Sequence, residues 1–298
     1  MVPYPTISLS LLEAFLVEDA PWGDITSRTL LPESLVIQAA ISFREEGVLA
    51  GGDEISRLFL AHGVEVVMSA RDGELISAQD IVATLYGSAH EILLIERTAL
   101  NLLSRMSGIA TKTRAYVHLL ATKDTHCRIA ATRKTAPGLR MLDKKATIIG
   151  GADPHRYTLS DAILIKDTHR LLVPLDEAIQ CAKSMYGYVF VEAEIESVDD
   201  GIRAAHAGAD AIMADNMSPE QVMELIDALH REALFGKVLL EVSGGISEKT
   251  LLQYAGIGVD RISIGALTHS VTAIDVALEI LAKHGENAPH VKPSSFLR

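Results

Sequence analysis

The first third of the chain alternates short apolar segments with polar turns. Apolar and β-branched residues recur at strand spacing in three segments, residues 36–43, 64–68 and 81–86. Helical spacing of apolar residues predicts a helix over residues 53–61. Clustered strands with helices at their edges are typical of an α+β sandwich, so we expect such a domain here.

Two capping boxes predict further helices in this region. Ser10 and Glu13 have the Ser-x-x-Glu spacing that begins a short amphipathic helix. Ser88 and Glu91 repeat this spacing before a long helical stretch. Because glycine weakens a helix interior, we expect that stretch to break near Ser107-Gly108.

After Lys123 the pattern changes to short apolar strands that alternate with amphipathic helices. Strands are expected at residues 129–132, 163–165, 189–191, 211–214, 238–242 and 262–264. Helices are expected at 174–185, 198–207, 219–231, 248–254 and 273–283. The alternation indicates parallel strands, either in an α/β barrel or in a doubly wound sheet. No glycine-rich nucleotide fingerprint follows any strand, which disfavours a Rossmann or P-loop fold.

The carboxyl end of each expected strand carries polar side chains or glycine. In parallel α/β folds these ends form the face at which ligands bind. The residues are Arg133, Lys134, Lys166, Glu192, Glu194, Asp215, Asn216, Ser243, Gly244, Gly245, Gly265 and Ala266. We therefore expect them to surround one site.

Cationic side chains concentrate near two of these strand ends and after a glycine pair. Arg133 and Lys134 follow one strand, Lys166 follows another, and His155-Arg156 comes shortly after the glycines. A single such residue is usually a solvated surface charge. Gathered at one rim, however, like charges repel unless an anion binds. We interpret the group as a site for a small, multiply anionic molecule.

Two acidic residues end neighbouring strands and form a candidate metal site. Mg²⁺ prefers one or two carboxylates completed by substrate phosphates, so Glu194 and Asp215 predict a magnesium–phosphate site. Glu192 is a competing ligand, because it lies on the same strand face as Glu194. Helix capping or pairing with nearby cations is the alternative explanation of these acids.

Glycine turns follow the last two strands. Residues 243–245 and 265–266 offer unobstructed backbone N–H groups where helices begin, an arrangement typical of phosphate binding. Tight turns alone would also account for the glycines. His269, beside the second turn, is expected to be a structural hydrogen-bonding residue.

Composition narrows the class of protein. The 298 residues suffice for one large or two ordinary domains. A net charge of −12 argues against binding nucleic acid or an anionic membrane. The two cysteines, Cys127 and Cys181, give neither a disulfide framework nor zinc spacing, which favours a reducing compartment. With no leader and no apolar run of membrane-spanning length, we expect a cytoplasmic protein.

Taken together, these motifs resemble the quinolinate phosphoribosyltransferase family. The residues that carry the resemblance are 96–101, 107–111, 132–135, 137–140, 155–156, 164–167, 192–194, 215–216, 243–245 and 265–269. The resemblance implies an N-terminal α+β open sandwich, made of residues 1–122 and about 270–298 and including a C-terminal helix. It also implies an incomplete, seven-stranded α/β barrel over residues 123–269. The family pattern further implies a homodimer in which Arg97 reaches into the neighbouring subunit's site.

The resemblance also implies a reaction in NAD biosynthesis. Quinolinate and phosphoribosyl pyrophosphate would give nicotinate mononucleotide, CO2 and pyrophosphate. Mg²⁺ would be held near Glu194 and Asp215, with Lys134 and Lys166 as further catalytic residues, and the glycine turns would bind the 5-phosphate. The residues implied in substrate binding are Arg97, Arg133, Lys134, His155, Arg156, Lys166, Ser243, Gly244, Gly245, Gly265 and Ala266.

Two other functions remain open. One is that of a related phosphoribosyltransferase-like protein encoded beside molybdate transporters, whose pattern lacks the lysine at Lys166 and the run at 265–269. Both features are present in this chain. The other is a non-catalytic phosphometabolite-binding protein on the same fold. The combined presence of cations and both carboxylates argues against it, since a pure binder needs no site for a metal and a leaving group.

Overall fold

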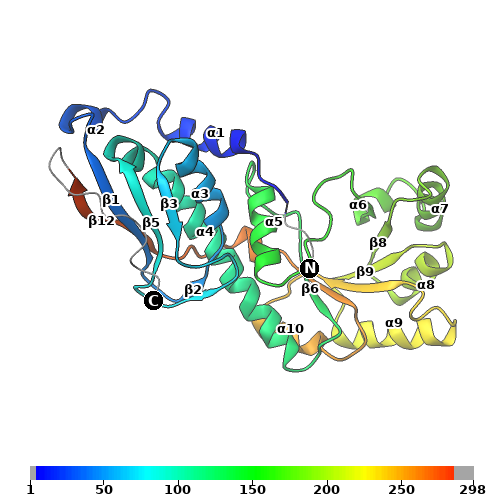
Figure 1. Cartoon of the computed structure of the whole chain (residues 1–298). Coiled ribbons are helices and arrows are strands. Elements are labelled where there is room, and N and C mark those ends of the chain that lie inside the picture. Colours follow the sequence, from blue (N-terminus) through cyan, green and yellow to red (C-terminus); the bar gives the residue numbers. More distant parts are fainter. Residues whose placement is uncertain (1–4, 285–298) are drawn as a thin grey trace. The chain divides into compact units, whose positions relative to one another are not determined.

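The computed structural model describes residues 5–284 and divides the chain into two compact units (Figure 1). One unit consists mainly of Ile109–Val271, and the other combines Thr6–Gly108 with the described residues from Thr272 onward. The division falls inside a helix at Gly108, whereas the sequence pattern placed a domain boundary at residue 122. The end of the predicted first domain, residues 285–298, lies outside the described residues.

The unit that contains Thr6–Gly108 is built on a four-stranded antiparallel sheet with the order β12-β1-β5-β3. Its strands are β1 (Val36–Phe43), β3 (Glu65–Met68), β5 (Ile81–Ser88) and β12 (Val276–His284). A separate pair joins β2 (Gly47–Val48) to β4 (Leu75–Ile76). The helices are α1 (Leu9–Asp19), α2 (Ile25–Leu30), α3 (Gly52–Ala61) and the part of α4 (Ala89–Ala121) up to Gly108. The expected α+β sandwich is thus confirmed.

The expected C-terminal helix at 273–283 was wrong, because this segment forms strand β12. β12 pairs antiparallel with β1 along its whole length, from Val276 opposite Phe43 to a bulge at Gln38/Ala39 and beyond. The apolar residues of this segment fit a strand as well as a helix. They occur at every second position, at Val276, Leu278 and Ile280, and the first and last of these are also four residues apart. The edge of β1 offers backbone hydrogen-bond partners, and this pairing selects the strand.

Two other local predictions were also wrong. The N-cap of helix α1 is Ser8 rather than Ser10, since the Ser8 Oγ accepts a hydrogen bond from the Leu11 N–H at 3.3 Å. Helix α4 continues without a break through Gly108. A Cβ at Gly108 would lie 2.1 Å from the Thr272 carbonyl oxygen, so the glycine permits a close backbone approach.

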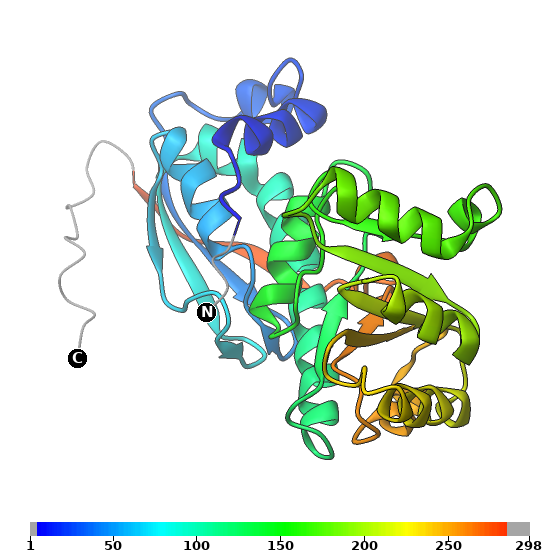
Figure 2. The ribbon, with the colours of Figure 1, turned by 90° about the vertical axis from the view of Figure 1, so that its right-hand side faces the viewer.

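The second unit contains six parallel strands with the order β6-β11-β10-β9-β8-β7 (Figure 2). The strands are β6 (Arg128–Ala131), β7 (Ile163–Ile165), β8 (Val191–Ile195), β9 (Ala211–Asp215), β10 (Leu239–Ser243) and β11 (Arg261–Ile264). Beyond β6, Asp153 forms a single parallel bridge with Ala130. Sequence patterns identified six of the seven strands implied for the barrel. The seventh is reduced to this single bridge at Asp153, and the incomplete barrel is confirmed.

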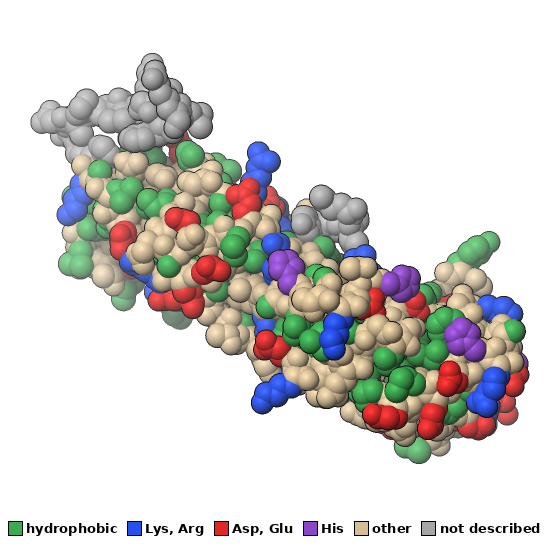
Figure 3. Space-filling model, turned by 90° about the horizontal axis from the view of Figure 1, so that it is seen from below, with side chains coloured by type: hydrophobic (Ala, Val, Ile, Leu, Met, Phe, Trp, Pro, Cys, Tyr) green, Lys and Arg blue, Asp and Glu red, His purple; other side chains and the backbone are tan. Residues whose placement is uncertain are grey.

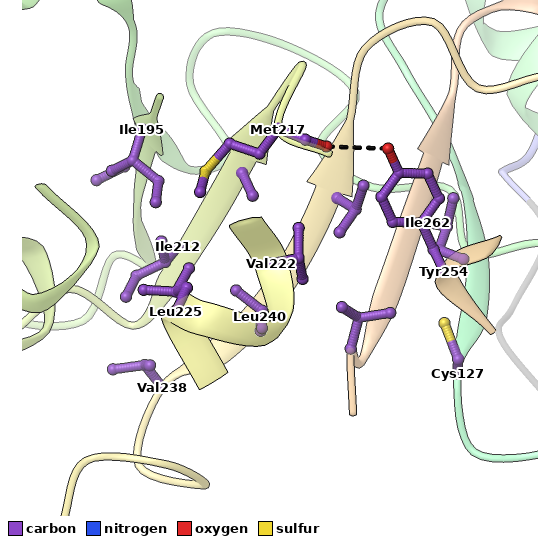
Figure 4. Close-up of a cluster of buried hydrophobic side chains, with 14 of the residues drawn as sticks. Cys127, Ile195, Ile212, Met217, Val222, Leu225, Val238, Leu240, Tyr254 and Ile262 are labelled. Atoms are coloured by element: carbon purple, nitrogen blue, oxygen red, sulfur yellow. Dashed lines mark hydrogen bonds between the residues drawn. The ribbon is translucent and has the colours of Figure 1, made fainter. Parts of the chain in front are cut away.

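Most helices of this unit connect successive strands and cover the outside of the sheet (Figure 1). Besides the second half of α4, they are α5 (Arg140–Ile149), α6 (Asp167–Arg170), α7 (Leu175–Met185), α8 (Val198–His206), α9 (Pro219–Arg231), α10 (Glu248–Tyr254) and α11 (Ala266–His269). Between α9 and the sheet, Val222 and Leu225 belong to the same buried cluster as Ile212 and Leu240 (Figure 4). The Tyr254 hydroxyl donates to the Met217 carbonyl at 2.9 Å at the edge of this core.

Strand β8 lies further along the chain than the expected strand at 189–191. As a result, Glu192 and Glu194 lie within the strand, and both are buried. Ala193 and Ile195 alternate with them and belong to the apolar cluster on the other face. Local patterns predict a loop where two carboxylates occur close together, because carboxylates are usually exposed. Here their partners come from distant segments, which local patterns cannot show.

Gly150 gives a stability prediction for this unit. A Cβ there would lie 2.5 Å from the Thr113 Cβ and 2.7 Å from the Ala110 carbonyl oxygen, so Gly150→Ala forces α5 and α4 apart. We expect a loss of about 1–3 kcal/mol, seen as a lower Tm in thermal unfolding. Gly187→Ala is the matched control, because a Cβ at Gly187 meets nothing within 4 Å. Equal Tm values for the two variants would contradict the tight packing at Gly150.

Candidate active site

The carboxyl ends of the barrel strands surround a cavity of about 340 Å³, within the size range of small-molecule sites. Its lining residues are Thr132, Arg133, Lys134, His155, Arg156, Leu164, Lys166, Glu194, Met213, Asp215, Ser243 and Ser263. Eight of these are predicted site residues. Gly244 and Gly245 directly follow the lining residue Ser243, and Gly265 and Ala266 come two and three residues after Ser263, but none of the four lines the cavity. Arg97 belongs to the other unit, where it is exposed on α4.

Arg133 presents a donor that the protein leaves without a partner. Its Nε is buried and has no hydrogen-bond partner among the described residues. Leaving a buried, charged donor unpaired costs more free energy than a typical hydrogen bond returns. An anionic ligand in the cavity would satisfy this donor.

Arg156 adds a second guanidinium group to the same wall. One of its nitrogens, Nη1, donates to the Ala162 carbonyl at 3.1 Å. Burial and the nearby charge of Arg133 lower the pKa of Arg156 from its ordinary value. The two guanidinium groups therefore repel one another, and a bound anion would relieve that repulsion.

Lys166 and Glu194 form an ion pair in the cavity. The Lys166 Nζ lies 2.9 Å from the Glu194 Oε2, so Glu194 is already compensated by a cation. Asp215, at the end of β9, accepts a hydrogen bond from the Asn216 side chain at 2.8 Å. With Lys134 also in the lining, cationic side chains outnumber the two carboxylates. On the molecular face in Figure 3, by contrast, basic side chains stand among acidic and apolar ones.

The two carboxylates fit a Mg²⁺ ion that is shared with a phosphate ligand. Glu194 and Asp215 both line the cavity, and within residues 5–284 they are not part of a group of three protein ligands. Mg²⁺ is usually held by one or two carboxylates, with phosphate and water oxygens completing its octahedron. The donor set therefore suits an ion that arrives with a phosphorylated substrate.

A buried polar cluster surrounds the His155 ring; sequence patterns single out His155 and Glu192 but miss the other members. The His155 Nε2 lies 3.1 Å from Glu192 and 3.5 Å from Glu241, and Arg261 contacts Asp153 at 3.0 Å and Glu241 at 3.6 Å. Ser263 donates a hydrogen bond to Glu241. The sequence feature that could have indicated this cluster is a charged residue inside an otherwise apolar strand, such as Glu241 in β10.

This cluster holds a proton on the His155 Nε2. The Arg156 N–H donates to Nδ1 at 2.8 Å, which leaves Nε2 as the protonated nitrogen that faces the carboxylates. Burial disfavours the charged imidazolium, but Glu192 and Glu241 outweigh burial and raise the pKa of His155. The Nδ1 contact opposes that rise, because a protonated Nδ1 cannot accept a hydrogen bond. Burial and the charge of Glu241 also raise the pKa of Glu192.

The glycine turns adopt conformations that restrict side chains. Gly244 has φ +91° and Gly245 has φ +60°, and a Cβ at Gly244 would lie 2.3 Å from the Asn216 Oδ1. At the second turn, a Cβ at Gly265 would lie 2.9 Å from the Lys134 Cδ. His269 is exposed, and its Nδ1 lies 2.8 Å from the Ser270 Oγ. The turns thus bring backbone close to Asp215-Asn216 and to Lys134.

The fold and this cavity define a parallel α/β barrel protein with a site for multiply anionic ligands. The chain belongs to the quinolinate phosphoribosyl transferase family, whose N-terminal domain model matches residues 24–107 and whose C-terminal domain model matches residues 109–279. No helix in the described part of the chain is long and apolar enough to cross a membrane.

Named relatives agree with this assignment. A probable nicotinate-nucleotide pyrophosphorylase (carboxylating) of Methanothermobacter thermautotrophicus is 39% identical, covering 91% of this chain and 98% of its own. The human nicotinate-nucleotide pyrophosphorylase (carboxylating) is 34% identical, with 96% of both chains covered. The crystal structure of NadC from Streptococcus pyogenes superposes with a TM-score of 0.85 at 34% identity, covering 93% of this chain and 100% of that chain.

Proposed function

We propose that the protein transfers the phosphoribosyl group of phosphoribosyl pyrophosphate to quinolinate, forming nicotinate mononucleotide, CO2 and pyrophosphate for NAD biosynthesis. The observation that carries the proposal is the buried, unpaired Arg133 Nε in a cavity that also contains Arg156 and Lys166. Quinolinate carries two adjacent carboxylates, which such cations can bind together. The family and its named relatives support the same reaction.

The reaction proceeds by displacement at the anomeric carbon. The quinolinate ring nitrogen attacks C1′ of the ribose, the C1′–O bond breaks, and pyrophosphate leaves with the electron pair. The resulting pyridinium is an electron sink, so the carboxylate beside the nitrogen departs as CO2. Its bonding pair stays on the ring carbon, which then takes a proton. The task of the protein is therefore to orient the substrates and stabilise charge.

Residue roles follow from position in the cavity. Arg133 and Arg156 bind the quinolinate carboxylates, His155 lines the same wall with its ring held by the buried cluster, and Lys166 neutralises Glu194 until substrates arrive. Glu194 and Asp215 would hold Mg²⁺, which when bound would neutralise charge on the pyrophosphate leaving group. Lys134 lines the same cavity and contributes a further positive charge.

The 5-phosphate is placed at the glycine turns. Ser243, Gly244 and Gly245 at the end of β10, and Gly265 and Ala266 after β11, supply backbone N–H groups. The positive φ values of Gly244 and Gly245 support this role, because a left-handed turn can direct successive N–H groups toward one anion.

A turnover assay tests the function. Purified protein receives magnesium and phosphoribosyl pyrophosphate with either quinolinate or nicotinate. We expect nicotinate mononucleotide from quinolinate and none from nicotinate, because nicotinate lacks the second carboxylate. If folded protein makes no product from quinolinate, the proposed reaction is wrong.

We further propose a homodimer in which Arg97 completes the site of the neighbouring subunit. Arg97 is exposed on α4, in the unit that does not contain the cavity, which supports a role in another subunit's site. Arg97→Ala and Lys166→Ala are each expected to be inactive. Co-expressing them should restore about a quarter of wild-type activity, since half the dimers are mixed and each mixed dimer has one intact site. No recovery in mixed dimers, isolated by two affinity tags, would contradict the exchange of Arg97.

A further inference from the structure

One lysine of the barrel unit is entirely withdrawn from solvent. Lys144 lies on α5 and has 0% exposure. Lysine is almost never fully buried unless its ammonium group is paired. Here the acceptors are backbone carbonyls: the Lys144 Nζ donates to Ala131 at 3.4 Å, to Arg156 at 3.0 Å, and to Pro154.

These three carbonyls belong to the two segments that carry the cationic site residues. Ala131 ends β6, two residues before Arg133. Pro154 and Arg156 flank His155. The Lys144 ammonium group therefore links the Arg133 segment to the His155-Arg156 segment through hydrogen bonds. Lys144 itself does not line the cavity.

A second side chain on the same helix joins the same two segments. Arg140, one turn before Lys144, donates from Nε to the Thr135 Oγ1 at 3.2 Å and from Nη1 to the Tyr157 carbonyl at 3.4 Å. The first turns of α5 thus support both segments. Lys144 is the buried member of this support, and Arg140 is the half-buried one.

The electrostatic environment of Lys144 shows that its charge is costly. Burial lowers its pKa to about 7; Asp153 opposes this effect, whereas Arg140, Arg133 and Arg156 reinforce it. A buried ammonium group loses its hydration, and only its hydrogen bonds inside the protein offset that cost. Apolar packing alone would not require a charge here, so the three hydrogen bonds to the site segments are the reason for a lysine at this position.

We propose that Lys144 is a positioning residue that sets the spacing between Arg133 and the His155-Arg156 pair. The proposal rests on the function proposed above, in which Arg133 and Arg156 bind quinolinate. The two carboxylates of quinolinate are fixed on a planar ring, so the spacing of the cations must match them closely. A misplacement of about 1 Å can reduce activity by about 100-fold.

Kinetics of Lys144→Met test this role. We expect the KM for quinolinate to rise by about 30- to 100-fold, with the KM for phosphoribosyl pyrophosphate changed less than about twofold. Lys183→Met is the matched control, because the Lys183 Nζ pairs with Asp210 at 2.8 Å, at the amino-terminal end of β9. It removes a partly buried lysine away from the cavity and should leave both KM values unchanged. Lys144→Gln, a change that keeps a donor, should give an intermediate KM for quinolinate.

Hydrogen exchange of the ligand-free protein gives a readout that does not depend on the reaction. Amides of residues 132–136 and 155–157 should exchange faster in Lys144→Met than in Lys183→Met, because the hydrogen bonds that link their segments are lost. Unchanged exchange in these segments, or equal rises in both KM values, would overturn the positioning role. If the wild-type protein fails to use quinolinate, the proposed function is wrong, and the exchange comparison still decides whether Lys144 positions the two segments.

Discussion

Replacing Arg133 with methionine is expected to raise the KM for quinolinate by about 100- to 1,000-fold, because removing one partner of a buried charge pair costs about 2–5 kcal/mol. The Arg133 Nε is buried and unpaired among the described residues, so the ligand supplies its partner. Methionine preserves much of the volume while removing every donor. Steady-state kinetics with each substrate in turn measure the effect.

A lysine at this position should recover only part of the binding. Lysine restores a point charge but not the planar fork that binds a carboxylate through two nitrogens. Arg203→Met is the control, since Arg203 forms an exposed pair with Asp176 at 2.7 Å outside the cavity. If Arg133→Met retained the wild-type KM for quinolinate, the carboxylate-binding role would be wrong.

The second large effect is expected for Asp215→Asn, which should lower turnover by about 100-fold or more through the loss of charge stabilisation at the leaving group. Asparagine has nearly the same shape as aspartate but no negative charge to hold Mg²⁺. The magnesium concentration for half-maximal activity should rise. Quinolinate binding, measured by calorimetry without phosphoribosyl pyrophosphate, should change little.

Asp215 is a cleaner choice than Glu194 for this experiment. Glu194 pairs with Lys166, so Glu194→Gln would also release a cation into the quinolinate site. Asp176→Asn, at an exposed carboxylate of the same unit, is the control for loss of one negative charge. If Asp215→Asn weakened quinolinate binding and left the magnesium dependence unaltered, the metal role of Asp215 would be incorrect.

Much of the barrel could be predicted from local sequence patterns. Alternating apolar strands and amphipathic helices are local patterns, and helices α9 and α10 have the bounds that those patterns predict, Pro219–Arg231 and Glu248–Tyr254. The cations and carboxylates at strand ends could also be identified, because parallel strands bring their carboxyl ends to one face. Arg133, Lys166 and Asp215 do line one cavity.

Other features could not be predicted from local patterns, because they depend on partners that are distant in the sequence. Strand β12 forms because β1 offers it a free edge, and a glycine stands inside α4 at position 108 because Thr272 approaches the helix closely there. Glu192 and Glu241 are buried in strands because His155 and Arg261 meet them there. From the sequence, Lys144 cannot be distinguished from an ordinary helix lysine, because the carbonyls that accept its hydrogen bonds belong to other segments. Local patterns record which residues can be buried, whereas a buried charge is explained only by partners that folding brings together.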